Sequence, residues 1–258
     1  MSRIGIDGFE QLVPEGIPKA GTVLLLVPPT EEKDQLAAQF LLEGLRGGEA
    51  AIVVASDAGI RDLVRRMGNL GFDADKAVAL GRAIPVDWDR AAAPKNGDAG
   101  GLPGVEAALI AATASAKEFP AIRAIVDLSR ALPQPLSSLS LEDLIAKLLR
   151  IAKASGALSL FLAPRARGVT PAVVETFDLV LDLRPLTPSG VQLAVVAIGG
   201  TPLPRSGMVL ALVEGRLVLD ASKRPAPPMP TEPMEEPSAP MEAPSTEGDA
   251  EEPGGGDV

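Results

Sequence analysis

Short apolar runs alternate with amphipathic segments along the first part of the chain. Residues 22–27 are a run of β-branched and Leu residues, and residues 34–46 carry apolar side chains at helical spacing before Gly47. Residues 51–55 form a second apolar run, followed by an apolar stripe at helical spacing over 60–70. Runs of strand length followed by a period near 3.6 predict two consecutive strand and helix units.

The middle of the chain continues this alternation, and the last part is dominated by strands. Residues 88–104 are rich in Gly, Pro and Asp, so we expect a long surface loop there. Ser140 and Asp143 form a capping pattern that predicts a helix to about 155. The other predicted elements are a helix at 105–118 and strands at 122–128, 157–163, 179–183, 191–198, 209–213 and 216–219. The pattern predicts an α/β fold, with a mostly parallel sheet flanked by helices and antiparallel strands at its C-terminal end.

Composition changes at about residue 221. Residues 221–258 hold nine acidic and two basic residues, nine prolines, and no Leu, Ile, Phe or Trp. Such a segment buries too little apolar surface to offset its ordering entropy. We therefore predict a folded domain at 1–220 and a disordered Pro/Glu-rich acidic tail at 221–258. The tail is interpreted either as a solubilising segment or as an arm that docks a partner.

The residue inventory excludes several kinds of chemistry. The chain has no His and no Cys, so catalysis by a cysteine nucleophile, proton transfer through His and zinc-finger folding are all excluded. Aromatic residues make up 3% of the chain and its formal net charge is −10, which makes nucleic acid an unfavourable partner. The apolar runs are too short to span a membrane, and the sequence begins without a signal-peptide pattern. We expect a cytoplasmic protein that does not enter a membrane.

An ordered series of short segments resembles the KaiC-like branch of the RecA-type P-loop ATPases. The likeness covers roughly 8–219. Its segments are Gly8 to Leu12, Gly16 to Gly21, the Pro28-Pro29 turn, Gln39 to Leu45, Val53 to Ser56, Arg65 to Phe72, Ile122 to Ser129, and Gly199 to Ser206. The resemblance implies a RecA-like sheet, with a phosphate-binding loop after the first strand and a Walker B aspartate at the end of a later strand.

The resemblance also shows what the phosphate loop has lost. Three family glycines are replaced, by Val27, Thr30 and Glu32. Asp34 stands where the family has a hydroxyl that binds Mg²⁺, and only Lys33 of the phosphate-binding residues remains. With Glu31, Glu32 and Asp34 at the start of the helix, a triphosphate would meet like charges at short range. This predicts a degenerate Walker A motif.

Two further acidic residues match family positions in part. Asp127 stands at the Walker B position, where it is interpreted either as a Mg²⁺ ligand or as an ordinary turn residue. Asp57 lies near the family's catalytic acid pair, where it is interpreted either as a general base or as the N-cap of a helix starting at Gly59. The family's trans-acting Lys-Met-Arg run reads Val196 to Gly199 here, without charge.

These observations favour a non-catalytic KaiC-like module, a pseudo-ATPase with a regulatory or assembly role in signal transduction. On this reading the chain has no catalytic residue, cofactor or metal, and it acts through protein partners such as an active KaiC-like paralogue or a second copy of itself. The alternative is a divergent ATPase that binds ATP through Lys33 and Asp34, holds Mg through Asp127 and uses Asp57 as the base. A third reading is a sensor that binds a small molecule in the emptied cleft.

Overall fold

The computed structural model describes residues 3–28, 30–94, 101–130, 132, 136, 140–165, 169–186 and 190–220. The predicted acidic tail at 221–258 lies outside the described residues. Within the described part, nine strands form one sheet in the order β3-β2-β4-β5-β1-β6-β7-β8-β9. The first six strands in this order are parallel to one another and the last three are antiparallel. The predicted fold class is confirmed.

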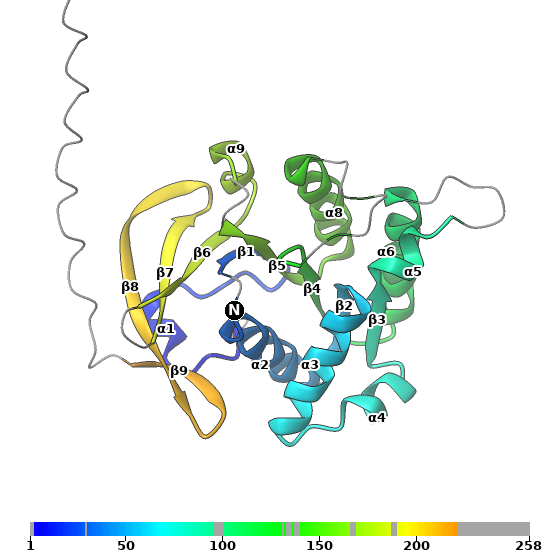
Figure 1. Ribbon diagram of the computed structural model, residues 1–258, viewed down its shortest axis with the longest axis horizontal. Helices are drawn as coiled ribbons and strands as arrows, with labels where there is room; N and C mark the ends of the chain where they lie inside the picture. Colours follow the sequence, from blue (N-terminus) through cyan, green and yellow to red (C-terminus); the bar gives the residue numbers. More distant parts are fainter. Residues whose placement is uncertain are drawn as a thin grey trace, which may run out of the picture. The chain divides into compact units, whose positions relative to one another are not determined.

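The strands of the parallel part are nearly continuous apolar runs, because helices cover both faces of the sheet. Figure 1 shows α2 and α3 on one face and α6 and α8 on the other. The strands are β1 (Thr22–Val27), β2 (Ala50–Ala55), β3 (Ala83–Asp87), β4 (Ile122–Asp127), β5 (Leu158–Pro164), β6 (Leu179–Pro185), β7 (Val191–Ile198), β8 (Thr201–Val213) and β9 (Arg216–Asp220).

The four longest helices, α2, α3, α6 and α8, follow the predicted periodicity, whereas the short helices α1, α4 and α9 were not predicted. They are α1 (Phe9–Leu12), α2 (Glu32–Arg46), α3 (Asp57–Asn69), α4 (Ala74–Ala79), α5 (Trp88–Ala92), α6 (Leu102–Ala116), α8 (Leu141–Ser155) and α9 (Pro171–Val174). Ser140 caps α8 as predicted, because its hydroxyl accepts a hydrogen bond from the amide of Asp143 at 3.0 Å. The Glu214-Gly215 turn joins β8 to β9, and both residues have positive φ, as in the tight turns that favour hairpins.

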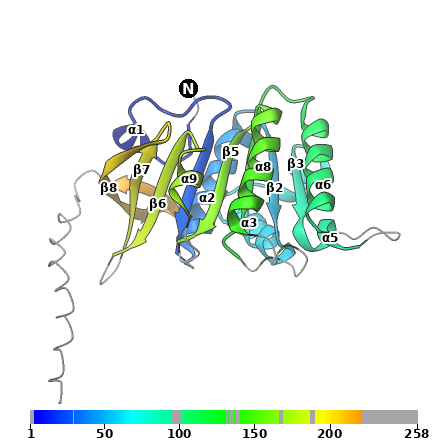
Figure 2. The ribbon, with the colours of Figure 1, turned by 90° about the horizontal axis from the view of Figure 1, so that it is seen from above.

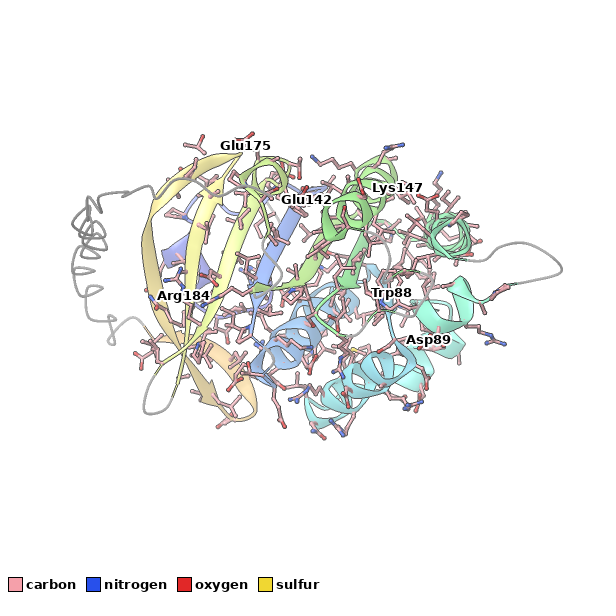
Figure 3. The ribbon with its side chains drawn as sticks, turned by 45° about the horizontal axis from the view of Figure 1, so that its top comes forward. Trp88, Asp89, Glu142, Lys147, Glu175 and Arg184 are labelled. Carbon is pink, nitrogen blue, oxygen red and sulfur yellow. The ribbon has the colours of Figure 1, made fainter. Side chains whose placement is uncertain are left out.

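One predicted loop contains a helix, and one strand was not predicted. The predicted surface loop at 88–104 contains α5, and Trp88 is only 1% exposed. Asp87 caps this short helix through the amide of Asp89, and Trp88 and Asp89 are labelled in Figure 3. Strand β3 was missed, because an edge strand with Pro85 at its centre gives no alternating apolar pattern.

Both edges of the sheet are protected against further strand pairing. At one edge Pro85 interrupts the hydrogen-bonding pattern of β3. At the other edge the side-chain amide of Gln39, on α2, accepts from the amide of Leu217 at 2.6 Å and donates to its carbonyl at 3.0 Å. The amide of Leu219 donates to the carbonyl of Asp7 at 3.0 Å. Residues outside the sheet therefore satisfy the free edge of β9 and fix the hairpin against α2.

Candidate functional site

The end of β1 and the end of β4 meet the first turn of α2, and three charged side chains come together there. Lys33 and Asp34 lie on that first turn, and Asp127 is the last residue of β4. Their relative exposures are 5%, 7% and 3%. In an open α/β sheet this edge, beyond the carboxyl ends of the parallel strands, is where ligands bind. The three residues that the family resemblance assigned to the alternative nucleotide site thus lie at this edge.

The ammonium group of Lys33 is held by carboxylates of its own chain. Its Nζ lies 2.6 Å from Oδ1 of Asp34 and 3.7 Å from Oδ2 of Asp127. Charges this deeply buried are stable only when they are paired. The positive charge of Lys33 is thus balanced by carboxylates within the protein.

Arg130, which sequence reasoning missed, completes the cluster. Its Nη2 lies 3.1 Å from Oδ2 of Asp34 and 2.9 Å from Oδ2 of Asp62 on α3, and its Nε lies 3.5 Å from Oδ2 of Asp127. Burial lowers the pKa of the Arg130 guanidinium, but the three carboxylates outweigh that effect and leave the pKa above its ordinary value. Arg130 therefore stays charged and links α2, α3 and β4.

The carboxylate of Asp127 also shapes the turn that follows β4. Its Oδ1 accepts from the amide of Ser129 at 2.9 Å and from the Ser129 hydroxyl at 2.5 Å. The backbone carbonyl of Asp127 accepts from the indole of Trp88 at 3.2 Å. One oxygen of this carboxylate stabilises the turn, and the other faces Lys33 and Arg130. In the part of the chain that the structure describes, no group of three or more acidic side chains is arranged to hold a metal ion.

The described residues of the loop before α2 do not adopt the positive φ angles that glycine favours. The amide of Thr30 donates to the carbonyl of Pro28 at 2.8 Å. Glu31 has helical φ and ψ, and Glu214 is the one described residue other than glycine with positive φ. The Glu31 side chain lies at the surface and pairs with Arg66 at 3.1 Å. The amides of Asp34 and Gln35 both donate to the carbonyl of Glu31. These two amides therefore already make the hydrogen bonds of the first helical turn.

Asp57 does not join this cluster. It is the first residue of α3, its side chain is 55% exposed, and it pairs with Arg61 one turn along the helix. The N-cap of α3 is Ser56, whose hydroxyl accepts from the amide of Gly59 at 3.2 Å, so the expectation that Asp57 is the cap was wrong. The carboxylate that α3 contributes to the cluster is that of Asp62.

Comparison with known proteins identifies the family. A family model described as "ATPase: KaiC" matches residues 2–180. The UPF0273 protein PF1931 of Pyrococcus furiosus is 33% identical over 85 residues, which are 33% of this chain and 34% of that protein. The matched segment thus spans about a third of the relative's length. Within the described residues, no helix is long and apolar enough to cross a membrane.

Proposed function

The chain belongs to the KaiC family of ATPases, and we propose that it is a non-catalytic member, a pseudo-ATPase that acts through protein interaction. The observation that carries the proposal is the ion-pair cluster of Lys33, Asp34, Asp62, Asp127 and Arg130 at the phosphate-binding edge of the sheet. In this cluster, carboxylates of the protein already pair with the lysine and arginine side chains that a phosphate would need to bind.

Electrostatics explain why these residues fit a magnesium triphosphate poorly. A phosphate that approaches Lys33 must displace Asp34, whose carboxylate lies 2.6 Å from the ammonium group. The displaced carboxylate stays nearby, and like charges about 4 Å apart repel by roughly 1–4 kcal/mol depending on the effective dielectric. Asp127, the Walker B candidate, already bonds Ser129 and faces Arg130. A triphosphate would therefore replace attractive ion pairs with repulsive ones.

The alternative, a divergent ATPase, rests on one observation. Lys33 and Asp127, the two residues that match the family's nucleotide site, do approach each other, with 3.7 Å between Nζ and Oδ2. In that reading Asp34 moves away when the nucleotide binds. Asp57 would not serve as the base, because it is exposed and paired with Arg61. Direct measurement of nucleotide binding separates the two readings.

As a pseudo-ATPase, the protein would retain the sheet and helices of the family as a scaffold for assembly. Its partner would be a KaiC-like protein with an intact phosphate loop, or a second copy of this chain. The support for this choice of partner is family membership alone, which is an argument by analogy. Co-purification with a tagged KaiC-like paralogue, compared with the chain alone by native mass measurement, tests the choice of partner.

Thermal unfolding in Mg-ATP tests the loss of nucleotide binding. A ligand at a hundred times its Kd stabilises the folded state by about 2.7 kcal/mol. For a chain of this size that raises the Tm by about 5–10 °C. We expect no shift for the unmodified protein, and no ATP turnover above buffer. Saturable binding of Mg-ATP at micromolar concentration would refute the proposal and favour the divergent ATPase.

A rebuilt loop provides the positive arm of this test. The combined substitutions Thr30→Gly, Glu31→Thr, Glu32→Gly and Asp34→Thr restore glycine freedom and remove three carboxylates, while Lys33 keeps its charge. We expect this variant to gain a Tm shift in Mg-ATP. Glu32→Gln alone is the matched control and should gain none, because Asp34 still holds Lys33.

A further inference from the structure

A groove runs along the N-terminal segment, at the end of the sheet opposite the ion-pair cluster. It consists of a cavity of about 580 Å³ and an adjoining cavity of about 470 Å³, which share Val13, Glu15 and Gly16. The strand β1 begins at Thr22 and carries the phosphate loop at its other end, so this groove and the cluster lie at opposite ends of the strand. Figure 2 shows the N-terminal segment and α1 along that end of the strands. We call it the N-terminal groove.

The groove is built into the fold. The carbonyl of Arg3 accepts from Arg123 at 2.7 Å, the carbonyl of Gly5 accepts from Gln39 at 3.1 Å, and Asp7 pairs with β9. Gly5 and Gly8 both have a φ of +85°, and a Cβ on Gly5 would overlap the carbonyl oxygen of Gln39. These contacts fix the backbone conformation of the N-terminal segment, so the groove is already present in the unbound protein.

The lining divides into an acidic part and an apolar part. Four carboxylates line the larger cavity, and in the described part of the chain none of their side chains makes a hydrogen bond or ion pair. They belong to Asp7, Glu10, Glu15 and Glu43. The smaller cavity is lined mainly by apolar side chains, namely Val13, Ile17, Pro18, Leu179 and Ile198. Arg3 and Lys19 are the basic residues of the two linings, so the groove is net negative.

We infer that the N-terminal groove docks a basic amphipathic peptide segment of a partner protein. Lysine or arginine side chains of that segment pair with Asp7, Glu10 and Glu15 at the rim, while an apolar side chain enters the cavity beside Ile198. Charge complementarity selects the basic occupant, and the apolar half of the groove selects an amphipathic one. In the ion-pair cluster each carboxylate is already paired with Lys33 or Arg130. The carboxylates of the groove have no such partner among the described residues, so they are available to a basic partner.

Binding of a fluorescent amphipathic peptide made of leucine and lysine to the full chain tests this inference. The variant carrying Asp7→Asn, Glu10→Gln and Glu15→Gln should bind it about tenfold more weakly at low salt, from three rim pairs. The same peptide with glutamate in place of lysine should not bind. Ile198→Ser should also weaken binding of the lysine peptide, because it removes apolar surface from the smaller cavity.

A matched variant separates the groove from the general negative charge of the chain. Asp75→Asn, Asp89→Asn and Glu118→Gln change the net charge equally at exposed positions outside the groove, and Asp89 is labelled in Figure 3. We expect this control to bind within about twofold of the unmodified protein, since distant exposed charges are screened. Equal weakening in both triple variants, or in neither, would overturn the inference. The inference would also be overturned if the unmodified protein did not bind the peptide but self-associated, and only the groove variant lost that self-association. The groove would then be the binding site for a second copy of the chain.

Discussion

Replacing Arg130 with methionine tests whether the ion-pair cluster holds the site together. The cluster contains two cations, Lys33 and Arg130, and three carboxylates. At the distances of Arg130 to these carboxylates, about 3–3.5 Å, each attraction is worth roughly 5 kcal/mol before desolvation at an effective dielectric of about 20. Desolvation offsets most of that, but loss of one partner leaves buried charge unpaired, which typically costs about 3–5 kcal/mol. Because Arg130 keeps 27% side-chain exposure, we expect about 3 kcal/mol.

Urea and thermal unfolding measure this loss. The single tryptophan, Trp88, is buried and donates to the carbonyl of Asp127, so its fluorescence reports on the cluster itself. Far-UV circular dichroism, which reports on the whole chain, should give the same midpoint if unfolding is cooperative. For a chain of this size, 3 kcal/mol lowers the Tm by about 6–12 °C. Arg61→Met is the matched control, since its pair with Asp57 is exposed and contributes less than about 1 kcal/mol.

Three outcomes would refute this reasoning. One is a loss below about 1 kcal/mol, which would mean that water screens the cluster as it screens surface pairs. Another is an equal loss in Arg61→Met, which would remove the distinction between buried and exposed pairs. The third is full recovery of stability in Arg130→Met on adding Mg²⁺ alone, since the freed carboxylates would then be a metal site.

Three further changes have definite expected outcomes. Asp127→Asn should cost about 1 kcal/mol by urea unfolding and show no Mg²⁺-dependent shift, because asparagine can still accept from the Ser129 amide. Gln39→Ala and Gln39→Glu should each cost about 2–4 kcal/mol: alanine leaves both backbone groups of Leu217 without a partner, and glutamate leaves the carbonyls of Leu217 and Gly5 facing a carboxylate that cannot donate. Unchanged stability in both variants would show that water replaces the amide. Removal of 224–258 should leave the Tm nearly unchanged, since the segment has no large aliphatic or aromatic residue other than methionine; a drop of several degrees would contradict this.

Most of the fold follows from hydrophobic periodicity, and the exceptions have physical causes. The central parallel strands are apolar on both faces, so a run such as Val23 to Val27 is visible without any knowledge of its neighbours. Strand β3 is invisible for the opposite reason: it lies at an edge and contains Pro85. Helix α5 was hidden because its five residues precede a Gly/Pro-rich stretch, although Asp87 before Trp88 is a capping signal.

The candidate site was predicted in its location and only partly in its contacts. The family resemblance assigned Lys33, Asp34 and Asp127 to one alternative site, and the three do meet, because strand ends and the following helix start share one edge. Arg130 and Asp62 had no motif to mark them, and their role depends on the packing of α3 against α2. A cluster with two basic side chains and three acids, spread from Lys33 to Arg130, cannot be found by spacing alone.

The charge count of the cluster makes its members unequal, and this bears on the rebuilt loop. Neutralising any one of Asp34, Asp62 or Asp127 leaves two carboxylates facing two cations, whereas neutralising Lys33 or Arg130 leaves three carboxylates facing one cation. Single carboxylate variants should therefore be tolerated and single cation variants should not. Because the rebuilt loop removes Asp34 and keeps both cations, it should still fold. It would also release Lys33 and Arg130 from one shared partner, so that both cations can attract a phosphate at the start of α2.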